Sequence, residues 1–365
     1  RRAPRTSCSD SEAEEFAYAL SARRVTSASM KSADTSRVRP IRRSGKPAAL
    51  VAGLAALILV TSGCLGPITR LERIEAVRFP ETSDASVVRV GDTYYIYGSN
   101  NHLRAPVFVT KDISRPYSLG EKNTTTYEAM PTKPAWAAQN MQLWDPTVGQ
   151  YAGRWVMFFA ADRINPPDPN NRQCIGRAWA NSPTGPFVPE PSPWNCGLRG
   201  TGGALDPQLF ADPWGRHFLL AAFGDTESPI HSIPLDGNAN AAGPPVAILS
   251  RQHGWEYHFI EQPAMVWDPK ANNYILTYSA GRWWEAAYSI GIARCVDVMG
   301  PCFSDPAGPW VAASNGRTGP GALSFFQDAE GAQRAIFSSF PAGRETTNGG
   351  RSASVYYMKF DPNPA

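Results

Sequence analysis

The chain has 365 residues, in which 35 Lys and Arg stand against 32 Asp and Glu, for a formal net charge of +3. Residues 1–64 hold 11 of the basic and 5 of the acidic residues, so residues 65–365 carry 24 basic against 27 acidic residues. A mildly acidic chain without a basic stripe argues against nucleic acid as a partner, and these 301 residues are enough to bury the core of one domain.

The N-terminal region has the composition of a leader. Residues 1–29 show neither hydrophobic periodicity nor turn chemistry and Met30 is the first methionine, so we expect 1–29 to be a non-native or upstream extension. Residues 30–64 carry a basic stretch, an apolar run over 48–60 and small residues before Cys64. This pattern predicts a lipoprotein signal peptide with lipidation at Cys64, and hence an exported protein that is lipid-anchored at the cell envelope or secreted. A transmembrane helix is the alternative, but thirteen apolar residues are fewer than the roughly twenty it needs.

From residue 84 onward, one pattern recurs about every sixty residues. An acidic residue precedes a short apolar run, a turn signal such as Gly91-Asp92, and a second run rich in aromatic and β-branched residues, which is typical of a β-hairpin. In chain order the copies are DASVVRVGDTYYIYG from Asp84, DPTVGQYAGRWVMFFA from Asp145, DPQLFADPWGRHFLLAAFG from Asp206, EQPAMVWDPKANNYILTYSAG from Glu261, and the non-acidic ALSFFQDAEGAQRAIFSSF from Ala322. The intervals are 61, 61, 55 and 61 residues, and no stretch of ten residues after the leader shows a clean helical period. Repeats of this size predict an all-β, five-bladed β-propeller that occupies residues 65–365.

Four cysteines follow the leader, in two close pairs. Cys174 and Cys196 bracket one predicted blade edge, and Cys295 and Cys302 bracket another. Export places them in an oxidising compartment, so we expect two local disulfides. Zinc is the competing hypothesis, but spacings of 22 and 7 residues lack the Cys-x-x-Cys knuckle of structural zinc sites.

The acidic residues of the repeat are candidates for catalysis. An Asp before Pro at the start of a strand commonly caps a turn, and this explanation suffices for any one copy. Equivalent positions in a closed ring of blades meet around its axis, however, so Asp84, Asp145, Asp206 and Glu261 are expected to converge. Converging carboxylates are what general acid and base chemistry requires.

Several motifs resemble glycoside hydrolase family 43. They are DASVVRVGDTYYIYG, LDPQLFADPWG, IEQPAMVWDP with YSAGRWWEAAYSIGIARC, and NSPTGPF, and the resemblance covers roughly residues 77–360, with cysteine bracketing similar to that of secreted actinobacterial members. The resemblance implies a five-bladed propeller enzyme that cleaves arabinosides or xylosides with inversion.

Carried over position by position, the resemblance implies three catalytic roles. Asp84 would be the general base, Glu261 the general acid, and Asp206 the carboxylate that orients the acid and tunes its pKa. An inverting enzyme holds its two carboxyl groups about 6.5–9.5 Å apart to admit a water. We expect the charge of the third carboxylate to raise the pKa of Glu261 and keep it protonated.

Other residues are candidates for substrate binding. Asp145 stands two residues earlier than the acidic residue that the family has in its second blade, so it binds a sugar hydroxyl or only caps the strand. Aromatic rings can stack on sugars, although each one can equally pack in the core. The candidates are Trp144, Asp145, His102, Trp283, Trp284 and Arg351.

We predict no bound metal and no cofactor, because the last histidine is His258 whereas many relatives carry a histidine in the fifth blade. The expected state is a monomer with a carbohydrate substrate.

Two other functions stay open. A non-catalytic carbohydrate-binding propeller is the main alternative, given the departures in the second and fifth blades. A retaining fructan hydrolase is weaker, because the Asn-Asp-Pro-Asn motif it would need near the first blade is missing.

Overall fold

The computed structural model describes residues 69–79, 82–99, 105–113, 125–197, 202–224, 229–314, 316–345 and 351–360. Within these ranges the regular elements are β-strands, which are antiparallel except for one short parallel contact. None of the described residues forms a helix long and apolar enough to span a bilayer. The predicted signal peptide, Cys64 and His102 lie outside the described residues.

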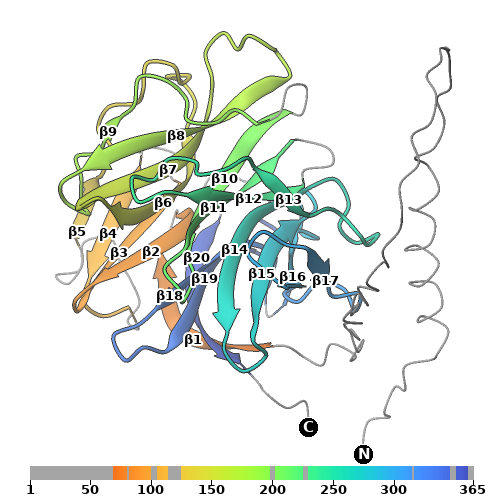
Figure 1. The fold of residues 1–365 in the computed structure, drawn as a ribbon. Helices are drawn as coiled ribbons and strands as arrows, with labels where there is room; N and C mark the ends of the chain where they lie inside the picture. The colour runs from red at the N-terminus through yellow and green to blue at the C-terminus, as the bar shows by residue number, and fades with distance from the viewer. Residues whose placement is uncertain are drawn as a thin grey trace, which may run out of the picture. The chain divides into compact units, whose positions relative to one another are not determined.

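The strands form five sets of four, which follow one another along the chain except that β1 belongs to the last set (Figure 1). The first blade contains β2 (Ser83–Val90), β3 (Thr93–Ser99), β4 (Pro106–Thr110) and β5 (Thr125–Glu128). The second contains β6 (Leu143–Tyr151), β7 (Arg154–Asp162), β8 (Asn171–Ala180) and β9 (Val188–Pro189). The third contains β10 (Gly202–Ala211), β11 (His217–Phe223), β12 (Ile230–Leu235) and β13 (Val246–Leu249). The fourth contains β14 (Ile260–Asp268), β15 (Asn273–Ala280), β16 (Ser289–Cys295) and β17 (Cys302–Ser304). The fifth contains β18 (Arg317–Gln327), β19 (Gln333–Pro341), β20 (Ser352–Phe360) and β1 (Thr69–Phe79).

The first strand of each repeat lies innermost, next to the propeller axis. These inner strands β2, β6, β10, β14 and β18 contact one another in cyclic order, with β18 returning to β2. The described chain is therefore a five-bladed β-propeller, as the repeat predicted. The second and third blades are also joined by hydrogen bonds, through the short parallel contact of β10 with β8.

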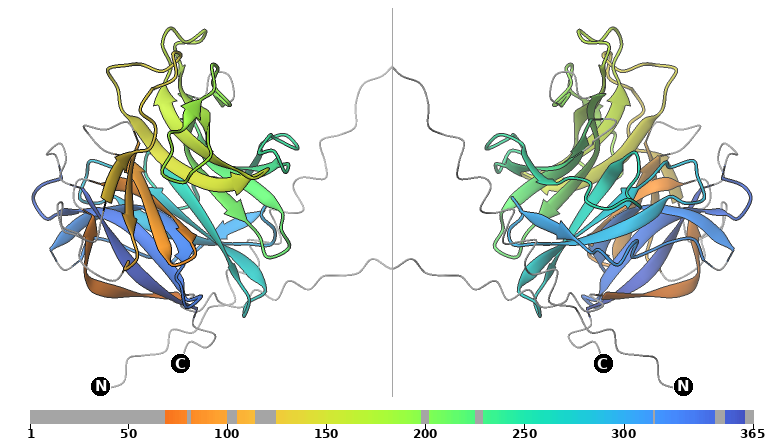
Figure 2. Two further views of the ribbon diagram at one scale, coloured as in Figure 1. Left: turned by 90° about the vertical axis from the view of Figure 1, so that its left-hand side faces the viewer. Right: turned by 90° about the vertical axis from the view of Figure 1, so that its right-hand side faces the viewer.

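The fifth blade is built from both ends of the described chain. Strand β1 pairs antiparallel with β20, which in turn pairs with β19, so an N-terminal strand completes the last blade (Figure 2). Hydrogen bonds between the two ends hold the ring together. The repeat pattern did not identify this strand.

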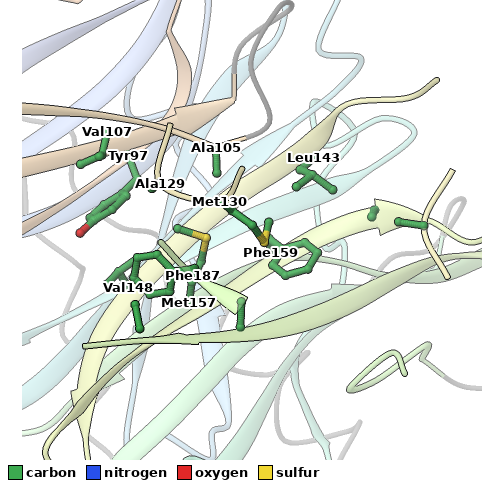
Figure 3. Close-up of a cluster of buried hydrophobic side chains, with 14 of the residues drawn as sticks. Tyr97, Ala105, Val107, Ala129, Met130, Leu143, Val148, Met157, Phe159 and Phe187 are labelled. Atoms are coloured by element: carbon green, nitrogen blue, oxygen red, sulfur yellow. The ribbon is translucent and has the colours of Figure 1, made fainter. Parts of the chain in front are cut away.

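Apolar side chains fill the space between neighbouring blades. Between the first and second blades, Tyr97, Phe159 and Phe187 are buried together with Met130 and Met157 (Figure 3). Burial of one such side chain contributes roughly 1.5–3 kcal/mol to stability. A second large cluster, which includes Tyr274, Tyr278 and Leu276, fills the space between the third and fourth blades.

The turns within the five hairpins fall where the sequence placed them. Strand β2 ends at Val90 and β3 begins at Thr93, with Gly91 at φ 60° between them. The second hairpin is alike, with Gly153 at φ 75°. Glycine accepts this left-handed conformation without the penalty that a Cβ atom brings.

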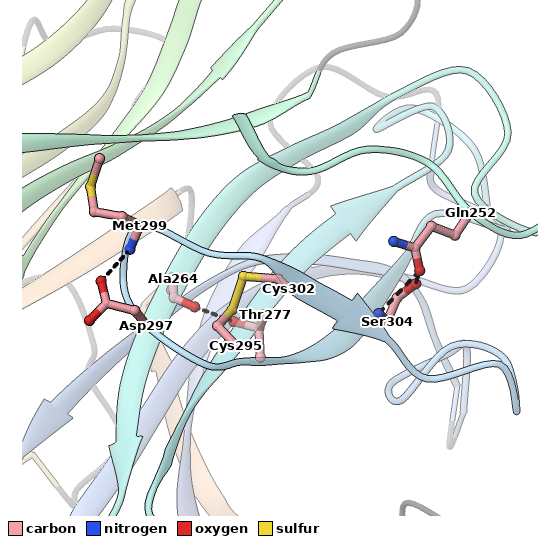
Figure 4. Close-up of a disulfide and its surroundings, with 8 residues drawn as sticks. All are labelled: Gln252, Ala264, Thr277, Cys295, Asp297, Met299, Cys302 and Ser304. Atoms are coloured by element: carbon pink, nitrogen blue, oxygen red, sulfur yellow. Dashed lines mark hydrogen bonds between the residues drawn. A yellow bond between two sulfur atoms is a disulfide. The ribbon is translucent and has the colours of Figure 1, made fainter. Parts of the chain in front are cut away.

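Both predicted disulfides are confirmed. Cys174 on β8 is bonded to Cys196, and Cys295 on β16 is bonded to Cys302 on β17. In the fourth blade the two cysteines are direct partners across the β16–β17 ladder, so the disulfide ties the outer strand to its neighbour (Figure 4).

Candidate active site

One position near the start of each inner strand has an unusual backbone. Its φ angle is positive in a non-glycine residue, which is uncommon and typical of strained or functional sites. A break in the ladder register accompanies it in every blade, as in a β-bulge. The residues are Asp84 at 51°, Asp145 at 50°, Asp206 at 55°, Gln262 at 51° and Ala322 at 56°.

This geometry corrects the register of the repeat in the fourth blade. The sequence alignment put Glu261 level with the aspartates, but the residue with the equivalent backbone is Gln262. The prolines give the correct register, because Pro146, Pro207 and Pro263 each follow the residue with positive φ. Glu261 therefore comes from the position before the bulge, and its carboxyl group has a different environment.

A small cavity lies on the axis where the five positions meet. Its lining consists of the five residues with positive φ and the residues that follow them, among them Ala85, Pro146, Pro207, Gln208, Pro263, Leu323 and Ser324. The predicted convergence of Asp84, Asp145 and Asp206 is confirmed. Glu261 does not line this cavity. It is connected to the lining residue Gln262 by hydrogen bonds through Tyr288.

The carboxyl group of Glu261 is enclosed and held by one hydroxyl group. The residue is 9% exposed, and the Tyr288 hydroxyl oxygen lies 2.6 Å from its Oε1. Burial, with the nearby charge of Asp206, raises the pKa of Glu261 to about 8, while Tyr288 and Arg351 oppose the rise. The direction is the one expected for a general acid, although burial and not the neighbouring carboxylate is its largest cause.

Asp145 and Asp206 form a hydrogen-bonded pair of carboxyl groups. Burial raises the pKa of Asp145 well above its ordinary value, and the charges of Asp206 and Asp84 add to the rise. Burial also raises the pKa of Asp206, to about 7, against the lowering effect of hydrogen bonds from Asp145 and from the backbone N–H of Gln262 at 3.0 Å. A protonated Asp145 that donates to Asp206 satisfies both groups.

Asp84, in contrast, is surrounded by donors. The hydroxyl of Ser83 donates to its Oδ2 at 3.1 Å, and Nε2 of Gln262 donates to its Oδ1 at 2.9 Å. Nη1 of Arg351 lies 3.5 Å from the same Oδ1. Such an environment suits a carboxylate that accepts hydrogen bonds.

Arg351 closes this side of the site. Its side chain is 9% exposed, and its guanidinium lies over the rings of Tyr288 and Phe340 at 5.5 and 5.6 Å. Nε and Nη2 are buried without a hydrogen-bond partner among the described residues. Two strong donors are therefore enclosed beside the carboxyl groups without an acceptor among the described residues.

Comparison with known proteins decides the family. The model described as "Glycosyl hydrolases family 43" matches residues 79–364. The chain belongs to this family.

Individual relatives agree with this placement. An extracellular endo-α-(1→5)-L-arabinanase of Thermotoga petrophila is 27% identical over 261 residues, which cover 63% of this chain and 52% of the relative. The chain thus spans about half the length of that curated relative.

Solved structures share the fold. A thermostable family-43 glycoside hydrolase superposes with a TM-score of 0.65 at 19% identity, covering 80% of this chain and 98% of the other. An α-L-arabinofuranosidase from Lactobacillus brevis superposes with a TM-score of 0.64 at 17% identity, covering 78% and 92%.

The aromatic candidates of this family-43 chain have unequal surroundings. Trp283 and Trp284 are 48% and 39% exposed, with their rings edge to face at 5.3 Å, in the β15–β16 connection that also holds Tyr288. This connection lies at the end of the blade where Glu261 is found, because Ile260 pairs with Ala280. Trp144 is half-buried beside Asp145.

Three polar residues of the site were missed from the sequence. Gln262, Tyr288 and Ser279 are hydrogen-bonded to one another at the centre of the carboxylate group. The aligned prolines would have identified Gln262. No sequence signal identifies Tyr288 or Ser279, since both come from the neighbouring strand and its connection.

The residues present do not fit a metal ion held beside a fifth-blade histidine. Ala322 occupies the position with positive φ in that blade, and the amide nitrogen of Gln262 is directed at Asp84 and, at 3.4 Å, at Asp145. Among the described residues, no group of three or more His, Cys, Asp or Glu side chains is arranged to hold a metal.

Proposed function

We propose that the protein hydrolyses α-L-arabinofuranosyl or β-D-xylosyl linkages with inversion, with Glu261 as general acid and Asp84 as general base. The observation that carries this proposal is the contrast between the two carboxyl groups. Glu261 is buried with its pKa raised to about 8, whereas Asp84 accepts hydrogen bonds from Ser83 and Gln262. Carboxyl groups whose environments differ in this way are suited to opposite halves of an acid and base reaction.

The proposed reaction starts with Glu261 protonated and Asp84 ionised. Glu261 donates its proton to the glycosidic oxygen as the bond from that oxygen to the anomeric carbon breaks. A water attacks the anomeric carbon from the opposite face and loses a proton to Asp84. The products are a free alcohol and a sugar with the opposite anomeric configuration, and the two carboxyl groups recover their starting states by proton exchange with solvent.

Asp206 acts on the acid without exchanging the proton itself. Its charge is the second cause of the raised pKa of Glu261, after burial. The pair that it forms with Asp145 keeps it hydrogen-bonded. In this role Asp145 supports Asp206, and a sugar hydroxyl could still reach the half-buried Asp145 from the cavity.

The substrate contacts are proposed from exposure and unpaired donors. Trp283 and Trp284 offer exposed rings for a sugar face, and Trp144 offers a third beside Asp145. Arg351 offers Nε and Nη2 to ring hydroxyls. His102 of the first blade is also proposed as a substrate contact, and this proposal rests on the sequence alone.

Arabinofuranosides are the first choice of substrate, because the Thermotoga petrophila relative is named as an arabinanase and the Lactobacillus brevis structure as an arabinofuranosidase. The former is also named as extracellular, which together with the two disulfides supports export. We propose that residues 30–64 are the leader, that Cys64 carries the lipid, and that the domain acts as a monomer without a cofactor.

The test is hydrolysis of a panel of arabinan, arabinoxylan and aryl α-L-arabinofuranosides and β-D-xylosides. The proposal expects release of reducing sugar from at least one member, and loss of that activity in Asp84→Asn and Glu261→Gln. Sugar binding by calorimetry without turnover of any member would favour the non-catalytic propeller instead.

A further inference from the structure

The side-chain amide of Gln262 connects the two proposed catalytic carboxyl groups. Its Nε2 lies 2.9 Å from Oδ1 of Asp84. Its Oε1 lies 2.8 Å from the hydroxyl oxygen of Tyr288, which is itself 2.6 Å from Oε1 of Glu261. Three hydrogen bonds thus lead from Glu261 to Asp84 through two side chains.

The orientation of this amide is fixed by its surroundings. Ser279 accepts a hydrogen bond from the backbone N–H of Ala322 at 2.9 Å and donates its own hydroxyl proton to Oε1 of Gln262 at 3.0 Å. A flipped amide would place its oxygen against the carboxyl groups of Asp84 and Asp145 and lose both bonds. The oxygen therefore faces Tyr288 and the nitrogen faces Asp84.

Tyr288 has two acceptors within reach but only one proton. When its hydroxyl donates to Gln262, the oxygen of Tyr288 can accept a hydrogen bond from a protonated Glu261. When Glu261 is ionised, the hydroxyl turns to that carboxylate and the bond to Gln262 is lost. All three bonds are therefore made only when Glu261 carries a proton, and the bond from Gln262 to Asp84 is strongest when Asp84 is ionised.

We propose that Gln262 is a positioning residue that competes with Glu261 for the Tyr288 proton, so that one relay favours a protonated acid and an ionised base together. The role of Gln262 in turnover rests on the proposed function, whereas the hydrogen-bonded relay does not. The reaction needs these same two protonation states at its start. The acid and the base need no direct contact, because the amide of Gln262 accepts a hydrogen bond at its oxygen and donates one at its nitrogen.

Gln262→Ala tests the relay directly. The alanine fits this backbone, because Ala322 occupies the equivalent position of the fifth blade at φ 56°. Without the amide oxygen, Tyr288 is free to donate to ionised Glu261, which stabilises the charged form. Carbon-13 NMR titration of the free protein should then show the Glu261 midpoint falling by about half a unit to one unit.

A double variant separates the relay from a general electrostatic effect. Tyr288→Phe removes the shared proton, so Gln262→Ala should have no effect on the Glu261 midpoint in that background. The other ionisable groups that face Glu261 are present in all of these variants, namely Asp84, Asp145, Asp206 and Arg351. Gln208→Ala is the matched control, since its amide lines the same cavity but donates to Ser324 at 3.2 Å, and it should leave the midpoint in place.

The outcomes are distinct. An unchanged or raised Glu261 midpoint in Gln262→Ala, or an equal fall in the Tyr288→Phe background, would overturn the relay. Gln262→Leu, which keeps more of the side-chain volume, gives the same test if the alanine variant is unstable. In turnover, the relay predicts that the alkaline limb of the pH profile of kcat moves down by the same half unit to one unit, with little change in KM. A wild-type protein without turnover would refute the proposed function, whereas the titration would still decide the relay.

Discussion

Arg351 of the last blade lies with Nη1 3.5 Å from Oδ1 of Asp84 in the first blade, across 267 residues of sequence. The contact joins the blade where the ring closes to the proposed base. A guanidinium that is 9% exposed, with Nε and Nη2 unpaired among the described residues, carries a desolvation cost that one long ion pair offsets only in part. A bound sugar would supply the missing acceptors.

We therefore expect Arg351→Met to weaken substrate binding. The KM should rise about tenfold to a hundredfold, as expected for the loss of one or two hydrogen bonds from a charged donor, with a smaller change in kcat. Arg334→Met is the matched control, because Arg334 is also buried in the fifth blade but pairs with Asp328. That variant should lower the melting temperature and leave KM in place; a KM unchanged in Arg351→Met would contradict the binding role.

The pH dependence of activity should show an alkaline limb set by Glu261. The general acid must be protonated, and burial raises its pKa to about 8, so the active fraction is high below that value and falls as the pH rises through it. Measured kcat/KM should therefore decline about tenfold per pH unit above pH 8. A decline that began well below pH 7 would contradict the assignment of Glu261 as the acid.

The same burial has a cost in stability. The folded pKa of Glu261 is raised from 4.5 to about 8, so the unfolded chain ionises first and stability is lost as the pH rises between these values. The loss is at most about 5 kcal/mol. Glu261→Gln removes it, so the variant should melt several degrees above the wild type at pH 8 and match it near pH 4.

Glu256→Gln provides the comparison for that measurement. Glu256 is 1% exposed in the same part of the chain, but its carboxylate accepts from the backbone N–H groups of Gln252 and His253 and from Tyr278. Replacing it loses acceptors that are in use, so this variant should melt below the wild type at pH 8. Equal shifts in both variants would show that the effect is not specific to the proposed acid.

The two disulfides should differ in their contribution. Cys174 and Cys196 close a loop with a sequence separation of 22, and Cys295 and Cys302 one of 7. In the chain-entropy model these correspond to about 3.4 and 2.4 kcal/mol. Chemical denaturation of the Cys174→Ser/Cys196→Ser variant should show the larger loss of stability, and the reverse order would mean that local packing outweighs loop closure.

Most of the fold could be predicted from the sequence, because each blade repeats the same local pattern of apolar and turn residues. Apolar runs separated by turn residues placed the five hairpins, and their spacing predicted the ring. Strand β1 has no such partner nearby in the sequence, since it pairs with β20 at the opposite end of the chain. Closure of the ring by strands from opposite ends of the chain depends on tertiary structure, so no local sequence pattern predicts it.

The site was predicted in part. The repeat identified Asp84, Asp145 and Asp206 in the correct register. It also identified Glu261, but one residue out of register, and the family resemblance supplied its role. Its raised pKa depends chiefly on burial, which spacing does not reveal. Tyr288 belongs to a connection rather than to the repeat, so its part in the site became visible only in three dimensions.

The central claim is that Glu261 and Asp84 hydrolyse a glycosidic bond with inversion. Proton NMR of the first product formed from an aryl α-L-arabinofuranoside, recorded before mutarotation, tests it most directly. The account predicts the β-anomer of arabinose from the wild type and no product above background from Asp84→Asn. A first product of α configuration, or wild-type turnover in Asp84→Asn, would contradict it.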